Sequence, residues 1–151
     1  AHSGEPQQDL WTFARALMLN WLIAGGEALA KDFSVLIGAG GRARLAPLRN
    51  LVSTLPWPAA DAVRRTPVTP EGTVYAFDEI GSRHWIRFAA EARLPAAQIL
   101  EAARDMAARI PDALRQVTAQ ARAEGVNHPI VMRLAELLGT RAERCARLLA
   151  G

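Results

Sequence analysis

The residues best suited to chemistry lie close together in the first quarter of the chain. A loop of small residues follows an apolar segment, precedes strand-forming residues, and carries Glu27, Lys31 and Asp32. Carboxylates in such a loop can serve as a general base or as oxygen ligands for a hard metal ion. On the residues alone, the same carboxylates can equally be solvated side chains of a turn. Lys31 is the only lysine in the chain.

This loop needs elements on both sides to position it. Apolar residues recur at three- and four-residue spacing over residues 7–24, which predicts a helix. Its last two turns are apolar nearly all round, so the helix should be buried. Gly25 and Gly26 should end it, because glycine tolerates the left-handed conformation found at helix ends. Residues 33–38 and 42–46 predict two strands joined by a glycine-rich turn, which is a β-hairpin.

The rest of the sequence is mainly helical. Residues 47–70 are rich in proline and predict an ordered surface loop, and residues 72–77 predict a short extended segment. Further helices should begin near Ser82, Pro95, Pro111 and Asn127. The last of these is expected to bury Val131, Leu134, Leu137, Leu138, Cys145 and Leu148. The predicted fold is therefore mainly α with a small β-hairpin region.

Composition and charge argue against several classes of function. The formal charge is only +3 and the arginines are scattered, so no basic tract indicates nucleic acid. The longest apolar run is too short to span a bilayer, and no secretory signal is recognisable. Cys145 is the only cysteine, which favours a cytoplasmic location and provides no zinc site. His84 and His128 stand in no metal-ligand spacing and are expected to be structural.

The length suits one domain over residues 1–151. The chain opens Ala-His-Ser-Gly without an initiator methionine, which suggests an artificial N-terminus or a piece of a longer polypeptide. Residues 1–6 are therefore expected to be disordered or foreign to the domain.

Four segments, taken in order, carry a resemblance to a known family. They are residues 20–37, the hairpin that follows, residues 45–58 with their Leu-Ala-Pro-Leu and Ser-Thr-Leu-Pro words, and the His-Trp-Ile-Arg-Phe motif at residues 84–88. Together they resemble the C-terminal lobe of the HipA-type toxin kinases, which are bacterial serine/threonine kinases of toxin–antitoxin modules. The resemblance spans about residues 10–149 and implies the C-terminal, helical lobe of a HipA-like protein-kinase fold.

That family carries an Asn-x-Asp-x-His-x-Lys-Asn signature in this loop and an Asp just after the Ala-Pro-Leu segment. The resemblance implies that the first Asp is the catalytic base, while the final Asn and the later Asp hold magnesium on the nucleotide phosphates. In this chain Glu27, Asp32 and Asn50 occupy those three positions, and Lys31 retains the signature lysine. The resemblance thus assigns Glu27 and Lys31 to catalysis and Asp32 and Asn50 to metal binding, with ATP and Mg²⁺ as cofactors.

Three functions follow from this comparison. Because three catalytic positions are substituted, and Gly25 and Leu29 also replace signature residues, the first is a degenerate lobe that is inactive alone. No glycine-rich loop of the kinase type is found in the sequence, and in a bilobal kinase that loop belongs to the N-terminal lobe. The second is therefore the C-terminal part of an active ATP/Mg-dependent kinase toxin, completed by an N-terminal lobe in cis or in trans.

The third function is a non-enzymatic interaction module that binds a HipB-like helix-turn-helix antitoxin. Direct DNA binding and membrane association are not expected in any of the three. A missing N-terminal lobe further predicts that residues 25–32 form an open cleft wall. Apolar residues beside that wall should be exposed or used for self-association.

Overall fold

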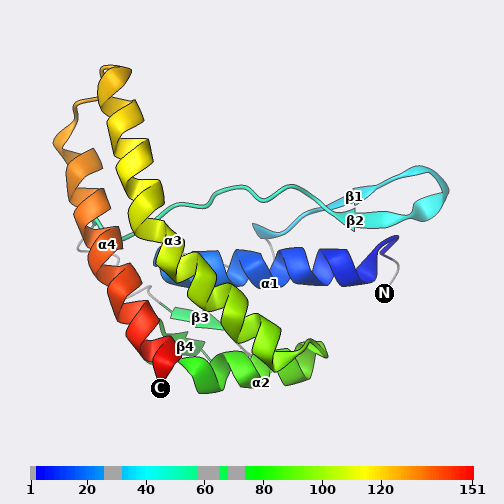
Figure 1. Ribbon diagram of the computed structural model, residues 1–151. Helices are drawn as coiled ribbons and strands as arrows, with labels where there is room; N and C mark the ends of the chain where they lie inside the picture. The colour runs from blue at the N-terminus through cyan, green and yellow to red at the C-terminus, as the bar shows by residue number, and fades with distance from the viewer. Residues whose placement is uncertain (1–2, 26–31, 58–64, 68–73) are drawn as a thin grey trace.

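The structure is a computed structural model and describes residues 3–25, 32–57, 65–67 and 74–151. This part of the chain forms four α-helices and two short hairpins (Figure 1). The elements in order are α1 (Pro6–Leu22), β1 (Val35–Ile37), the 3₁₀ turn η2 (Ala39–Gly41), β2 (Ala43–Leu45), β3 (Arg65–Pro67), β4 (Val74–Ala76), α2 (Ser82–Ala92), α3 (Ala96–Ala123) and α4 (Pro129–Ala150). The predicted fold class, mainly α with a small β-hairpin region, is confirmed. None of the described helices is both long and apolar enough to cross a bilayer.

Helix α1 is the buried central helix that its apolar pattern predicted. Met18, Trp21 and Leu22 have no exposed surface, and α1 contacts both α3 and α4. The helix ends at Leu22, two residues earlier than expected. The left-handed residue that follows is Ala24, with φ of 49°, and not Gly25. The predicted cap at Gly25 is therefore wrong, and Gly26 lies outside the described residues.

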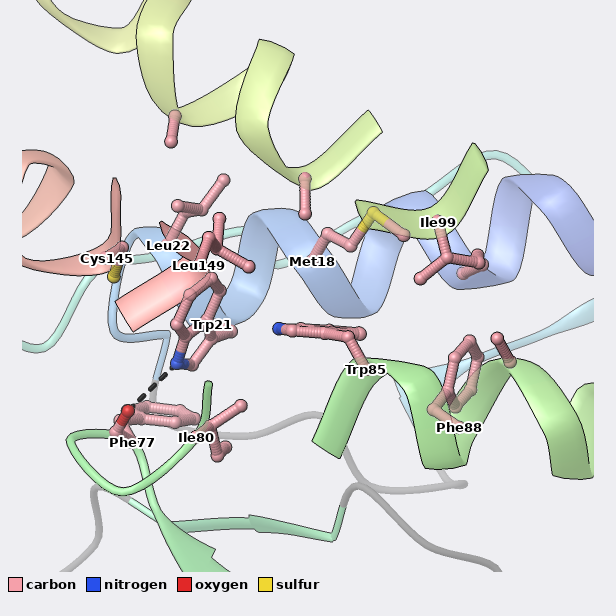
Figure 2. Packing of buried hydrophobic residues seen from close by; sticks show 14 of the residues in the cluster. Met18, Trp21, Leu22, Phe77, Ile80, Trp85, Phe88, Ile99, Cys145 and Leu149 are labelled. Atoms are coloured by element: carbon pink, nitrogen blue, oxygen red, sulfur yellow. Dashed lines mark hydrogen bonds between the residues drawn. The ribbon is translucent and has the colours of Figure 1, made fainter. Parts of the chain in front are cut away.

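The core is built around two tryptophans, Trp21 at the end of α1 and Trp85 on α2, whose rings meet between the two helices (Figure 2). The Trp21 and Trp85 rings lie 5.6 Å apart at 65°, an edge-to-face arrangement favoured by aromatic quadrupoles. The Trp21 indole N–H donates to the Phe77 carbonyl at 2.9 Å. The Trp85 N–H has no conventional acceptor among the described residues, and Figure 2 shows it pointing toward the Trp21 ring.

Helices α3 and α4 pack against each other, and their outer halves extend beyond the other elements, while the inner part of α3 lies beside α2 (Figure 1). The predicted break at Pro111 is wrong, because α3 runs through it without interruption. Proline removes a single intrahelical hydrogen bond there, and packing against α4 stabilises the continuous helix. Buried residues of α3 occur only in its inner half, at Ile99, Ala103 and Ala107.

The burial predicted for α4 is only partly correct. Cys145 is fully buried, and burial raises the pKa of its thiol to about 11, so the thiol is neutral and inert. The other predicted core residues are only half-buried: Val131, Leu134, Leu137, Leu138 and Leu148. The first four lie on the outer half of α4, where α3 is the neighbour that can cover them. Core residues that the pattern missed are Ala142 and Leu149.

The predicted hairpin is present as an antiparallel pair in which Leu36 faces Arg44. Gly40 and Gly41 take φ of 73° and 75° at its tip, a conformation that favours glycine. The second hairpin joins β4 to β3, and β3 lies where a loop was predicted. Residues 3–6 are ordered, which differs from the expectation that residues 1–6 are disordered. There Ser3 bridges β2, the Gly4 amide donates to the Ala43 carbonyl, and α1 already begins at Pro6.

Candidate functional site

The candidate loop departs from the C-terminal end of α1 through a close fit between two residues. Asn20 is buried, and its side-chain amide donates to the Gly25 carbonyl at 3.3 Å. A Cβ at position 25 would lie only 2.0 Å from Asn20 Oδ1. Glycine is therefore required at position 25 for as long as the Asn20 amide keeps this orientation.

A second segment of the chain fixes the same turn from the other side. Thr54 donates twice to the Ala24 carbonyl, from its amide at 3.1 Å and from its hydroxyl at 2.8 Å. Ser53 forms a β-bridge with Gly25. These bonds offset the cost of the left-handed conformation at Ala24, which is about 1–2 kcal/mol for a residue with a Cβ. The Ser-Thr-Leu-Pro segment thus anchors the start of the loop.

The structure brings the two predicted metal-binding positions to one recess. Asp32 and Asn50 both line a small cavity with room of about 20 Å³ for water-sized molecules. Its other lining residues are Ala16, Asn20, Phe33, Leu48, Arg49 and Leu51. Asp32 is half-buried, and Asn50 is exposed and left-handed with φ of 57°, which asparagine tolerates well. A space of this size suits about one water molecule or a bare cation.

The electrostatics of the recess include a residue that the sequence analysis did not single out. Arg49 lines the recess, and its guanidinium donates to the Ser34 hydroxyl at 3.3 Å. Its position directly before Asn50 in the sequence was the signal that could have identified it. The positive charge of Arg49 opposes the binding of a second cation at the recess, and its exposure to solvent limits this repulsion.

The two predicted catalytic residues, Glu27 and Lys31, lie outside the described residues, as does Leu29. Within residues 3–25, 32–57 and 74–151, no three His, Cys, Asp or Glu side chains gather closely enough to hold a metal. His84 instead accepts a hydrogen bond from the Gly81 amide through Nδ1 at 3.1 Å and caps α2. His128 likewise accepts from the Ile130 amide at the start of α4.

Apolar side chains on both sides of the recess are exposed. Those of β1 and of the segment after β2 each show more than a third of their surface, as expected for apolar residues beside the wall. They are Val35, Leu36, Ile37, Leu48, Leu51, Val52 and Trp57. Residues 26–31 of the expected open wall lie outside the described residues.

Comparison with protein families shows which family includes this loop. The model of the HipA-like C-terminal domain matches residues 1–114, which include α1, the candidate loop, both hairpins, α2 and the first part of α3. Residues 115–123 of α3 and all of α4 follow the matched region. With three quarters of its length matched, the chain belongs to the family of HipA-like C-terminal domains.

Proposed function

We propose that the chain is the C-terminal lobe of a HipA-like serine/threonine kinase from a type II toxin–antitoxin module, with a phosphoryl-transfer site that is degenerate. The observation that carries this proposal is the shared recess of Asp32 and Asn50 beside Arg49. Asp32, Asn50 and Arg49 all line this recess. The resemblance places an Asn and an Asp at these two metal positions, and this chain has them in the opposite order.

The donors at the recess fit magnesium only weakly. Magnesium takes oxygen ligands and is usually held by one or two carboxylates together with substrate phosphates and water. Asp32 would supply a carboxylate oxygen and Asn50 an amide oxygen. Bound magnesium neutralises charge on the transferred phosphate, and Arg49 would offset part of the attraction that holds the metal ion. Phosphoryl transfer depends on such positioning and neutralisation, so a weak site means little or no transfer by this chain alone.

Thermal unfolding of the chain tests this proposal. Melting is followed with ATP alone, with MgCl₂ alone and with both, because a ligand that binds the folded state raises the melting temperature. We expect no rise that requires both components. A clear rise that appears only when ATP and Mg²⁺ are present together would overturn the proposal.

The variant Asn50→Asp tests the same site in the opposite direction. A second carboxylate at the recess should strengthen divalent-ion binding by about tenfold, since metal affinity depends on the number of charged ligands. Titration with Mn²⁺, followed by water proton relaxation, measures this change. Asn127→Asp, in the exposed turn between α3 and α4, adds the same charge far from the recess and should leave Mn²⁺ binding unchanged. Equal affinity in the Asn50→Asp variant would argue against a metal position at the recess.

A second function, part of an active kinase completed by an N-terminal lobe, is favoured by one observation. Asp32 and Asn50 are distant in sequence and still line one recess, which supports the proposal that the two positions act together. Mixing the chain with an N-terminal lobe of the family, ATP and Mg²⁺ tests it. Labelled phosphate on a protein would support an active kinase, and its absence would favour the degenerate lobe.

A further inference from the structure

Strand β1 presents an apolar, unpaired edge. Val35, Leu36 and Ile37 are 61%, 56% and 76% exposed, although they are consecutive and so point to alternate faces of the sheet. Figure 1 shows β1 on the side of the hairpin that faces away from α1. A bare apolar edge of this kind is a template for another strand, and proteins usually protect it with charge, proline or a covering segment.

The hydrogen-bond pattern shows which groups this edge offers. The Gly38 amide donates to Arg42 and the Ala46 amide donates to Ser34, so these two residue pairs are hydrogen-bonded pairs. Such pairs alternate along an antiparallel ladder, which makes Leu36–Arg44 a hydrogen-bonded pair as well. The backbone groups of Val35 and Ile37 therefore point to the outer edge, away from β2.

The opposite edge of the hairpin confirms this alternation and is already occupied. The Ala43 carbonyl accepts from the Gly4 amide at 2.9 Å, and the Leu45 amide donates to Asp9 at 3.1 Å. Both groups point outward from β2, as the alternation requires. Among the described residues no backbone partner is found for the outer edge of β1, so the hairpin is closed on one side and open on the other.

We propose that β1 pairs with β1 of a second copy of this chain, antiparallel about a twofold axis at Leu36. Val35 of each copy then exchanges two backbone hydrogen bonds with Ile37 of the other. The Leu36 residues of the two copies face each other as a non-hydrogen-bonded pair. The register is self-complementary, since β-branched residues face each other across the strands. It brings no like charges together, because β1 is uncharged and Arg44 on β2 is already paired with Glu5 and Asp9. This inference does not depend on kinase activity.

Cysteine cross-linking tests the proposed register. In a non-hydrogen-bonded pair the two Cα atoms lie about 4.5 Å apart, which suits a disulfide. Leu36→Cys should therefore form a disulfide-linked dimer under mild oxidation. Ile37→Cys is the matched control, because it is more exposed but faces Val35 of the other copy and should link at least several-fold less. Val117→Cys, on α3 and 61% exposed, controls for random collisions, and Cys145 is buried.

A backbone variant separates strand pairing from simple apolar contact. Ile37→Pro removes an amide that points outward, so the internal ladder of the hairpin keeps its bonds while the proposed dimer loses two donors. Sedimentation of the unmodified chain should show a twofold rise in mass with concentration, and Ile37→Pro should abolish this rise. A monomer at every concentration, or Ile37→Cys linking as well as Leu36→Cys, would overturn the proposal.

Discussion

At the scale of single residues, the start of the candidate loop depends on the contact between Asn20 and Gly25. Gly25→Ala would place a methyl group 2.0 Å from Asn20 Oδ1, so the buried amide must turn and give up its bond to the Gly25 carbonyl. We expect a loss of about 1–3 kcal/mol in the free energy of unfolding, measured by denaturant titration.

Gly139→Ala is the matched control for this substitution. Gly139 lies within α4, and a Cβ there meets no atom within 4 Å. Because alanine favours helix over glycine, this variant should gain about 0.5–1 kcal/mol. A similar loss from both variants would mean that the contact with Asn20 is not the cause.

His84 is the residue whose titration should affect stability near neutral pH. Burial, followed by the positive charge of Arg83, lowers its pKa below the ordinary 6.5. The folded state therefore favours the neutral ring, and the unfolded state takes up a proton first as the pH falls. The contribution of His84 is fully present above pH 6.5 and is lost as the pH falls from there through the folded-state pKa.

Denaturant titrations at a series of pH values measure this dependence. Stability should decline below pH 6.5 in the unmodified chain, and His84→Asn, which does not titrate, should flatten the decline over that window. Asp9 also has a lowered pKa, set first by the hydrogen bond from Ser3, but its contribution is lost only below its ordinary value of 3.8. An unchanged pH profile in His84→Asn would assign the decline to another group.

At the scale of elements, periodicity identified most helices and the first hairpin, because both depend on local patterns of apolar residues and turn formers. It failed where distant packing decides the outcome. The sequence around Pro111 contains a standard helix-start signal, and packing of α3 against α4, which no local pattern shows, explains why the helix continues. The half-buried leucines of α4 have the same cause. An apolar stripe in the sequence does not show how many neighbouring elements will cover it in the fold.

The candidate site was predictable to a different extent. No local pattern relates Asp32 to Asn50, and their pairing came from the family resemblance; the structure places both at one recess. Arg49 stands directly before Asn50 in the sequence, but only the structure shows that it lines the recess. The functional roles of Asp32 and Asn50 remain predictions that the metal titration tests.

Pro111 also gives a prediction at this scale. Pro111→Ala restores the amide that can donate to the Ala107 carbonyl and removes the clash of the ring with the preceding turn. We expect the free energy of unfolding to rise by about 1–3 kcal/mol. The circular dichroism signal at 222 nm should therefore persist to higher denaturant concentration. Pro129→Ala is the control. Amides in the first turn of a helix have no intrahelical acceptor, so this substitution in α4 should change stability little. Destabilisation by Pro111→Ala would show that α4 packs on a bend that proline maintains.

At the scale of the whole molecule, arginines from neighbouring helices satisfy the C-terminal ends of others. Arg141 of α4 donates to the Trp21 carbonyl in the last turn of α1, at 3.1 and 2.7 Å. Arg104 of α3 donates to the Leu149 carbonyl in the last turn of α4, at 3.3 and 2.8 Å. A cation at the carboxyl end of a helix is also favoured by the helix dipole. The helices are thus linked by polar contacts as well as by the apolar core.

Helix α4 lies beyond the family match. Arg141 links this helix to the end of α1, from which the candidate loop departs. Arg141→Met keeps the length of the side chain but removes its bonds to Trp21 and Asp78, and we expect a loss of about 2–4 kcal/mol in denaturant titration. Arg144 contacts the same Asp78 at 3.2 Å but is half-exposed, so Arg144→Met should cost less than about 1 kcal/mol. Equal losses would mean that charge near Asp78, and not the buried bonds to Trp21, stabilises this junction.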